Sequence, residues 1–507
     1  MKRLLWVLAL SLLCASVLFA GGAGEAEEQE SASAEKAESV LIMANAQDIN
    51  NYNAFTQQYI AFEVIKYNCY ESLLIYDAEG KLQPSLATSV DKIDDVTYQI
   101  NLRPNVKFHN GEILNGEDVV FTFNYILTQE EAAYYKPFIS MIDSMEIVDD
   151  LTVKLNLSAP NPDLLGSLTL ICIVKKGTEG RLESTPIGTG PFKFVEWQPN
   201  EKTEFVRFEE YWDAGKPKVD RFVIRPLTDP KIQVTNLEAK TVNFVKDLAL
   251  EEYQTLKANP DLELFTTDTS NTVVVLEIGQ NNHEALSNPK ALEALWYCMD
   301  RNKINSSCFE GLGNIVNGAY PSGAKYFKAA KSIGFDVAKA KQLLAEAGYP
   351  DGFEFTLDVL VGYPWAEKLA QIWQAGLAQA GVDLKIAKLE ASIWIEHYLA
   401  RSYDVILNWY SMPGLDPSTF DNTITSPLVA AAFPEPEAVL ALVDAGKTQT
   451  DSPARAKVYS QLQSLVMSRY PYYLPIEMPV LFGWAKNLKG VEINSFQHIH
   501  LKDAYFE

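Results

Sequence analysis

The sequence predicts an α/β protein made of more than one folded part, on three observations. A chain of 507 residues exceeds what one hydrophobic core usually supports. Residues 353–410 alternate strand and helix patterns, whereas residues 90–157 show antiparallel strand patterns around one helix. Hydrophobic residues make up 47% and aromatic residues 11% of the chain, which is enough to fill a core in each of these parts.

Residues 1–20 are typical of a secretory signal peptide. Lys2 and Arg3 precede an unbroken apolar stretch, and Ala20 with the two glycines after it provides small residues for cleavage. The apolar stretch is shorter than the ~20 residues of a membrane-spanning helix. A lipid anchor at Cys14 is less well supported, because two leucines precede it where small residues are required. We therefore expect a soluble protein that is secreted across the inner membrane into the periplasm.

Residues 21–39 contain mainly Ala, Glu, Gly and Ser and no large apolar side chain. Such a segment buries too little surface to order itself, so it is interpreted as a flexible acidic leader. Four cysteines follow it, at positions 69, 172, 298 and 308, without the spacing of a metal site. An exported protein can form disulfides, and the pair nearest in sequence is Cys298 and Cys308. Buried free thiols are the alternative that the apolar neighbours of these residues favour.

The formal net charge is −23, from 43 Lys and Arg against 66 Asp and Glu. Nucleic-acid binding needs a basic face, so nucleic acid is excluded as a partner. Adhesion of the folded part to an anionic membrane surface is excluded for the same reason. The acidity is interpreted as a contribution to solubility and names no partner.

The region 353–410 has the clearest architecture. Strand patterns at 353–360, 382–389 and 403–407 alternate with a helical pattern at 365–380, and another helical pattern at 336–347 precedes them. Asp336 is the predicted cap of the earlier helix, and Gly348 and Gly381 are the predicted stops of the two helices. This order implies parallel strands joined by right-handed crossovers. Ligands of such sheets bind outside the carboxyl ends of the strands. Here those ends are residues 361–364 and 408–412, so we expect a binding site there.

The region 90–157 predicts a separate α+β part. "VTYQINLRPNVKF" and "MEIVDDLTVKLNL" alternate like antiparallel strands, with "EDVVFTFNYIL" between them as a helix. The longest later apolar run, residues 164–174, is too short to cross a bilayer and is interpreted as buried core.

Catalytic and metal motifs are not completed anywhere in the chain. "IGTGPF" at 187–192 lacks the Lys-Ser/Thr of a phosphate-binding loop, so a tight structural turn is predicted. His498 and His500 face one side of a strand but have no evident third ligand. Neither HExxH nor GxSxG occurs. We predict no catalytic residue, no metal and no cofactor.

Aromatic residues provide the strongest remaining signal. Trp394, Trp409 and Tyr410 cluster near one edge of the predicted parallel sheet, and Tyr363 follows a neighbouring strand. Adjacent residues on a strand point to opposite faces, so Trp409 and Tyr410 cannot share one core. We therefore expect at least one of them to line a binding cleft.

Four ordered blocks of the sequence resemble the family 5 extracellular solute-binding proteins, the dipeptide- and oligopeptide-binding components of ABC importers. The blocks are residues 86–127, 185–224, 288–304 and 335–359. The second of them contains "IGTGPF", which resembles the characteristic turn of this family. The similarity extends from about residue 40 to the C-terminus.

The resemblance implies a two-lobed clamp of the periplasmic-binding-protein-like type II fold. The first lobe is expected over residues 40–283 together with the tail 486–507, and it includes an extra α+β sub-domain at about 70–180. The second lobe is expected over 284–485. The lobes would close over a ligand, and the closed monomer would be recognised by an ABC permease with its ATPase subunits.

The resemblance also suggests binding residues. In peptide binders of the family, an aspartate three positions after the counterpart of Trp409 pairs with the α-ammonium of the ligand, and here that position is Met412. Asp416 or Asp48 could replace the missing carboxylate, and amides could supply hydrogen bonds. The candidate ligand-binding residues are Trp409, Tyr410, Met412, Asp416, Trp394, Tyr363, Asn408, Asp48 and Gln280.

The expected function is capture of a short peptide or peptide-like solute by lobe closure, followed by delivery to the permease. The sequence leaves an oligosaccharide open as the ligand, because Trp and Tyr faces stack on sugar rings. Two other classes stay open: an exported hydrolase with a dispersed active site, and a receptor subunit that presents its solute to a sensor.

Overall fold

The computed structural model describes residues 38–507 except 57–59, 247, 267–270, 413, 422–424, 426–427, 429–432, 434–435 and 495. The predicted signal peptide, Cys14 and nearly all of the predicted leader lie outside the described residues. Within the described residues, no helix is both long and apolar enough to cross a membrane.

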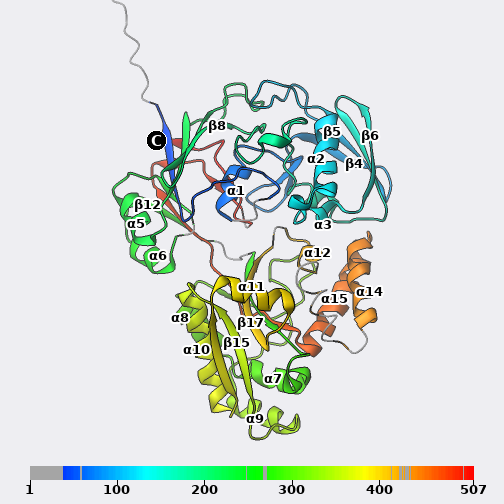
Figure 1. Ribbon diagram of the computed structural model, residues 1–507, viewed down its shortest axis with the longest axis vertical. Coiled ribbons are helices and arrows are strands. Elements are labelled where there is room, and N and C mark those ends of the chain that lie inside the picture. Colours follow the sequence, from blue (N-terminus) through cyan, green and yellow to red (C-terminus); the bar gives the residue numbers. More distant parts are fainter. Residues whose placement is uncertain are drawn as a thin grey trace, which may run out of the picture. The chain divides into compact units, whose positions relative to one another are not determined.

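The first sheet has seven strands. Their order is β12 (Leu262–Thr266), β20 (Leu481–Ala485), β11 (Phe244–Val245), β1 (Val40–Asn45), β10 (Arg221–Pro226), β9 (Lys202–Arg207) and β8 (Phe192–Gln198). The central strand β1 pairs in parallel with β10 and β11, whereas the outer pairs are antiparallel. The sheet therefore joins segments from both ends of the chain (Figure 1).

Each face of the first sheet is covered by a different core. Ala44 and Val245 pack with α5 (Pro230–Glu238) and α6 (Leu250–Leu256). Leu41 and Met43 point to the other face, because side chains alternate along a strand. There they belong to a larger core that continues into the antiparallel sub-domain.

The sub-domain contains a four-stranded antiparallel sheet, as predicted. Its order is β4 (Ala87–Lys92), β5 (Thr97–Leu102), β7 (Thr152–Leu157) and β6 (Ile142–Asp149). The predicted helix is α2 (Gly116–Thr128), which packs against β6 and β7 (Figure 1). Short elements in the same part of the chain are α1 (Ile60–Lys66), β2 (Leu74–Tyr76), β3 (Leu82–Pro84), α3 (Lys136–Ile139) and α4 (Leu164–Ser167).

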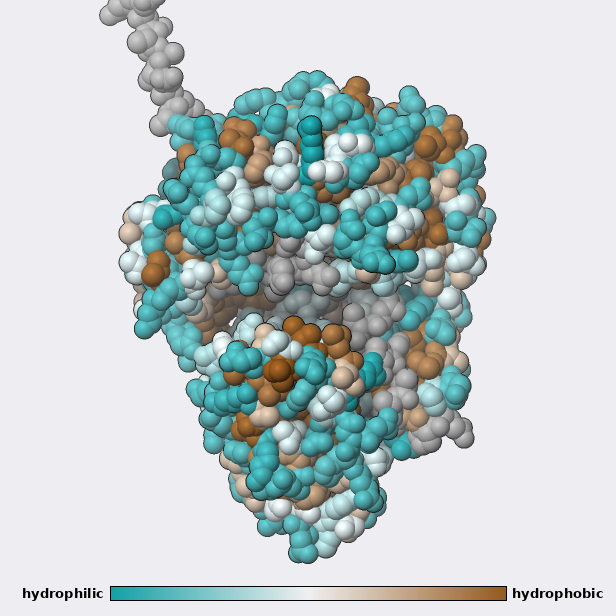
Figure 2. Space-filling view, in the orientation of Figure 1, coloured by the Kyte–Doolittle hydropathy of each residue, from teal (hydrophilic) through white to brown (hydrophobic). Residues whose placement is uncertain are grey.

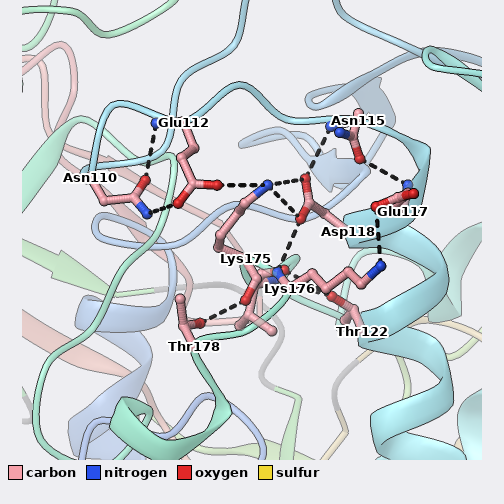
Figure 3. A network of polar contacts seen from close by, with 10 residues as sticks. Asn110, Glu112, Asn115, Glu117, Asp118, Thr122, Lys175, Lys176 and Thr178 are labelled. Atoms are coloured by element: carbon pink, nitrogen blue, oxygen red, sulfur yellow. Dashed lines mark hydrogen bonds and ion pairs between the residues drawn. The ribbon is translucent and has the colours of Figure 1, made fainter.

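A buried carboxylate anchors the first turn of α2 (Figure 3). Asp118 is fully buried and accepts hydrogen bonds from the backbone nitrogens of Asn115 (3.1 Å) and Lys176 (3.0 Å). The ammonium of Lys175 lies 3.1 Å from Asp118 Oδ1. Because a buried charge is costly unless paired, these contacts hold the sub-domain helix onto the segment 175–176.

The second sheet combines parallel and antiparallel pairs. Its order is β14 (Asn314–Ile315), β19 (Ile476–Glu477), β13 (Thr272–Ile278), β17 (Val405–Ser411), β15 (Glu354–Leu360) and β16 (Asp383–Leu389), and β18 (Tyr472–Tyr473) pairs with β13. β15 is parallel to both β16 and β17, which confirms the predicted crossover unit.

The third strand of this unit was predicted to end at residue 407, and this was wrong. β17 continues to Ser411 because β13 pairs with its whole length in antiparallel register, from Thr272 opposite Ser411 to Ile278 opposite Val405. Trp409 and Tyr410 therefore lie inside a strand. β13 already belongs to the second sheet, so sheet membership changes between β12 and β13.

Helices cover the second sheet. They are α7 (Pro289–Tyr297), α8 (Arg301–Cys308), α9 (Val337–Glu346), α10 (Pro364–Gln379), α11 (Ala391–Ala400), α12 (Pro417–Phe420), α14 (Pro436–Thr448) and α15 (Ser452–Arg469). The predicted cap Asp336 accepts a hydrogen bond from the Lys339 nitrogen. Gly348 and Gly381 follow α9 and α10 with φ of 94° and 89°, which confirms the predicted helix stops.

The structure decides between the two alternatives for the cysteines and confirms the turn predicted at residues 187–192. The four described cysteines are free and buried, and Cys298 and Cys308 form no disulfide. The "IGTGPF" segment is a tight structural turn: a Cβ on Gly188 would lie 2.0 Å from the carbonyl oxygen of Cys69, and the Gly190 nitrogen donates to that oxygen at 3.0 Å. The backbone approach explains the glycine without a phosphate ligand.

Candidate functional site

The two faces of the second sheet separate Trp409 from Tyr410. Trp409 belongs to the side covered by α10, where its ring centroid lies 4.5 Å from that of Tyr363 and 5.4 Å from that of Trp365. Trp409 is half-buried and the Tyr363 side chain is 38% exposed. These rings form an aromatic surface at the carboxyl ends of β15 and β17, where an open α/β sheet presents ligands.

The opposite face of the sheet contains a buried carboxylate that the sequence analysis missed. Glu277 is 3% exposed and accepts hydrogen bonds from the Tyr410 hydroxyl (2.7 Å), Asn408 Nδ2 (3.2 Å) and the Tyr403 hydroxyl (3.2 Å). Burial raises the pKa of Glu277, and these hydrogen bonds partly oppose that rise. The sequence pattern that indicates this buried carboxylate is a single Glu in the otherwise apolar run "TVVVLEIG".

This network uses the hydrogen-bonding groups of two candidate ligand residues. The Tyr410 hydroxyl donates to Glu277 and lies 2.8 Å from both Asn408 Nδ2 and the Tyr398 hydroxyl. Asn408 Oδ1 accepts from the Trp409 nitrogen at 2.8 Å. A hydroxyl has one donor and two acceptor sites, so Tyr410 has none left for a ligand. Asn408 and Tyr410 act here as parts of the scaffold that holds β17.

α11 lies over this network. Trp394 is 8% exposed and stacks on Tyr398 with ring centroids 5.5 Å apart, and its Nε1 has no hydrogen-bond partner among the described residues. His397 Nδ1 lies 2.7 Å from an oxygen of Asp358 on β15, which ties α11 to the sheet. Trp394 therefore belongs to the packing beneath α11.

The outer side of α11 is apolar. Ile393, Ile395 and Leu399 are 44%, 49% and 74% exposed. Figure 2 shows hydrophobic side chains gathered over α11, beside a place where the surface is hollowed.

The position expected to hold an ammonium-binding aspartate is apolar and buried. Met412 is 4% exposed, packs in the core with Val273 and Val275, and its nitrogen donates to the Asn271 carbonyl at 2.8 Å. Asp416 is engaged by the guanidinium of Arg455, with 2.5 Å from Nη1 to Oδ2 and 2.7 Å from Nη2 to Oδ1. Asp416 also caps α12 through the Ser418 nitrogen.

The last two candidates are hydrogen-bonded to other segments of the chain. Asp48 follows β1 of the first sheet and accepts hydrogen bonds from Trp197 Nε1 (3.1 Å) and the Asn200 nitrogen (2.8 Å). Gln280 follows β13 and donates to the carbonyl of Arg469 at 2.8 Å. Of the candidates, the structure brings Trp409 together with Tyr363. It also brings Asn408 together with Tyr410, which contacts Tyr398 of α11.

The histidines considered for a metal site are core residues. His498 Nε2 lies 2.9 Å from the Tyr67 hydroxyl, and burial lowers the pKa of His500 to about 4. Among the described residues, no group of three or more His, Cys, Asp and Glu side chains could hold a metal ion.

A small recess lies between the segment that follows α1 and the C-terminal tail, where His500 and Lys502 line it. Glu71 lines it and accepts hydrogen bonds from the Tyr211 hydroxyl (2.6 Å), Trp212 Nε1 (2.9 Å) and the Thr189 hydroxyl (2.8 Å). Burial raises the pKa of Glu71 to about 7. These contacts connect the segment after α1 with the "IGTGPF" turn, which is a structural role.

Comparison with known proteins decides the family. Residues 81–430 match the family described as bacterial extracellular solute-binding proteins, family 5 middle. This chain belongs to the family 5 bacterial extracellular solute-binding proteins. The resemblance and the fold expected from it are thereby confirmed.

Curated relatives include glutathione-binding proteins. The glutathione-binding protein GsiB of Pectobacterium atrosepticum is 31% identical over 332 residues, which are 64% of each chain. GsiB of Escherichia coli strain K12 is 26% identical over 458 residues, or 86% of this chain and 88% of the relative.

Solved structures share the two-lobed fold. The periplasmic binding protein DppA of Helicobacter pylori, in complex with the peptide STSA, has a TM-score of 0.76 and 22% identity, covering 92% of this chain and 98% of the other. The substrate-binding protein CtaP of Listeria monocytogenes has a TM-score of 0.83 and 24% identity, covering 92% and 99%. At this identity the likeness shows the fold alone.

Proposed function

We propose that the protein is the extracytoplasmic solute-binding component of an ABC importer and captures a short peptide or peptide-like solute by lobe closure. The observation that carries this proposal is the aromatic surface of Trp409 and Tyr363 at the strand ends of a family 5 chain. The glutathione-binding and peptide-bound relatives support a peptide-like ligand. The ligand is bound and released unchanged, so the protein is not an enzyme.

The aromatic surface suits a peptide because ring faces contact flat peptide groups and apolar side chains with little loss of side-chain entropy. Trp365 packs against Trp409 in a T-shaped contact, which positions the Trp409 ring before the ligand arrives. Since this surface contains no charge, a neutral oligosaccharide is the second candidate ligand.

The accompanying proposals concern location, lobes and partners. Residues 1–20 direct export to the periplasm and residues 21–39 form a leader. The lobes correspond roughly to residues 40–283 with the tail 486–507, and to 284–485. The chain changes sheets slightly before these boundaries, because β13 already pairs in the second sheet and β20 in the first. The closed monomer presents both lobes to an ABC permease and its ATPase subunits.

A ligand panel tests the proposal. Purified protein is screened by thermal shift against glutathione, peptides of two to five residues and neutral oligosaccharides, and native mass spectrometry identifies any solute retained from the host. A bound ligand raises the melting temperature by mass action. Stabilisation by peptides supports the proposal, and stabilisation by oligosaccharides alone selects the second candidate. A ligand recovered in cleaved form would instead indicate a hydrolase.

A further inference from the structure

The loop after β17 faces a carboxylate of the sub-domain that neither the sequence motifs nor the aromatic surface includes. Asp163 precedes α4, and its backbone is fixed by its nitrogen donating to Asn161 Oδ1 at 3.0 Å and its carbonyl accepting from the Ser167 nitrogen at 2.9 Å. Its side-chain carboxylate receives no hydrogen bond from the residues that the structure describes. The backbone is therefore ordered while the charged group is free.

Tyr76 brings a second oxygen to the same place. A Cβ on Gly166 would lie 2.4 Å from Asp163 Oδ1 and 2.9 Å from the Tyr76 hydroxyl, so both oxygens converge where Gly166 has no side chain. Tyr76 is 7% exposed, and its hydroxyl has no hydrogen-bond partner in the described part of the chain. The hydroxyl oxygen itself is not fully buried, so its donor and acceptor sites are open to solvent or to a ligand.

These oxygens adjoin the loop that carries position 412. The Tyr76 hydroxyl lies 4.0 Å from the Cβ position of Gly414, two residues after Met412. The Tyr76 ring is fixed by Phe496, at 5.0 Å between centroids, and its carbonyl by Asn494 Nδ2 at 3.2 Å. The pair Asp163 and Tyr76 thus approaches, from the sub-domain, the loop in which a peptide binder would place its aspartate.

The charges around Asp163 leave it without a close cation. The charged side chains that influence the pKa of Asp163 are Asp416, Arg455 and Lys325. Arg455 is already engaged in two hydrogen bonds with Asp416, and Lys325 forms no ion pair among the described residues but lies over the ring of Tyr326 at 5.1 Å. Burial and the like charge of Asp416 raise the pKa of Asp163, so its ionised form would gain from a cation placed beside it.

We propose that Asp163 and Tyr76 bind a primary ammonium group of the captured solute, in the manner of the α-ammonium of a short peptide. The carboxylate and the phenol oxygen each accept one N–H of the ammonium, whose three donors suit two converging oxygens better than a planar guanidinium would. The inference rests on the proposed function and places the polar end of the ligand site at the sub-domain. Asp163 would thereby supply the carboxylate that is missing at position 412.

The test compares a peptide with its N-acetylated form. Trialanine and N-acetyl-trialanine, or whichever peptide the ligand panel selects with its acetylated form, are titrated by calorimetry into the protein and its variants. Asp163→Asn should weaken binding of the free-amine peptide about 30-fold or more, because a buried charge loses its partner. Binding of the acetylated peptide should be unchanged by Asp163→Asn.

Two further variants separate recognition from folding. Tyr76→Phe keeps the ring packing, and it should weaken binding of the free-amine peptide by a smaller factor than Asp163→Asn does. Asp143→Asn removes an exposed carboxylate on β6 of the same sub-domain, and it should change the affinity for neither peptide. Each variant is first shown to melt like the parent protein. If Asp163→Asn fails that check, the Tyr76→Phe titration decides alone.

The outcomes distinguish the two proposals. Loss confined to the free-amine peptide supports the inference. If neither Asp163→Asn nor Tyr76→Phe changes the affinity for the peptide, the inference is overturned but the proposed function is retained. Equal loss for both forms of the peptide shows a structural effect and also overturns it. Absence of binding by any peptide to the parent protein overturns both.

Discussion

Asp416 and Arg455 form a bidentate ion pair in which both side chains are nearly fully buried, with exposed fractions of 4% and 1%. Arg455 Nε also donates to the Gly446 carbonyl at 2.6 Å, and the guanidinium lies over the rings of Tyr326 and Tyr459. The pair joins the start of α12 to α15. A residue that the sequence offers as a ligand carboxylate is therefore part of the frame of the second lobe.

Removing one partner of this pair should strongly destabilise the protein. Arg455→Met keeps the aliphatic stem but leaves the carboxylate of Asp416 buried and unpaired, so we expect the free energy of unfolding to fall by about 3–5 kcal/mol. Lys457→Met, an exposed change on the same helix, is the control. Urea denaturation of both variants measures the difference. A loss below ~1 kcal/mol for Arg455→Met would show that the pair is not the anchor.

Tyr410→Phe should destabilise the second lobe more than Tyr398→Phe. The first change removes a hydroxyl that donates directly to the buried Glu277, whereas the second removes one that reaches Glu277 only through Tyr410. Loss of a hydrogen bond to a buried charged group costs about 1–3 kcal/mol. Chemical denaturation of the two variants checks this order, and the reverse order would contradict the scaffold role of Tyr410.

Gly188→Ala should destabilise the protein by at least about 1–3 kcal/mol, the usual range for overpacking. Its new Cβ would lie 2.0 Å from the backbone oxygen of Cys69, which cannot move away as a flexible side chain could. Gly180→Ala is the matched control, because a Cβ there meets nothing within 4 Å. Melting temperatures of the two variants provide the measurement, and equal values would refute the close-approach explanation.

The contribution of Glu71 to the stability of the protein should fall as the pH rises from about 4.5 to about 7. Burial raises the pKa of Glu71 from 4.5 to about 7, so across this window the folded protein retains a proton that the unfolded chain has released. Glu71→Gln should remove this contribution, so that the stability of the variant relative to the parent rises with pH across the window. Asp421, whose pKa burial also raises to about 7, contributes with the same sign. His109 and His500, whose pKa burial lowers to about 4, contribute with the opposite sign, so the informative quantity is the difference between the parent and the variant.

Unfolding free energies measured from pH 4 to 8 for the parent and for Glu71→Gln test this expectation. A slope unchanged by the substitution would show that Glu71 is ionised throughout the window.

Trp409→Ala should weaken ligand binding while the protein stays folded, because it removes the ring that forms the aromatic surface with Tyr363. Phe335→Ala, which removes a 42% exposed aromatic beside Gly376 of α10, is the control and should leave binding unchanged. Calorimetric titration with the ligand identified by the panel measures both. Unchanged affinity in Trp409→Ala would remove this residue from the site.

Most of the architecture was predictable because its signals are local. The crossover unit, the cap Asp336, the stop glycines and the structural turn at 187–192 all follow from periodicity and backbone preference within short windows. The end of β17 was not predictable, since its last residues are held by β13, which lies more than a hundred residues earlier in the chain. The candidate site was predictable only as far as the aromatic surface at the strand ends.

The sequence by itself determined the family, the secondary structure of the crossover unit and the position of Trp409 beside Tyr363. Only the tertiary structure decided which polar groups are available to a ligand. Asp416 is neutralised by an arginine 39 residues away, and the Tyr410 hydroxyl is taken by a glutamate 133 residues away. Such pairings depend on which distant segments meet in the folded chain. Once a pair has formed, burial makes it costly to break, because each group would be left without a partner.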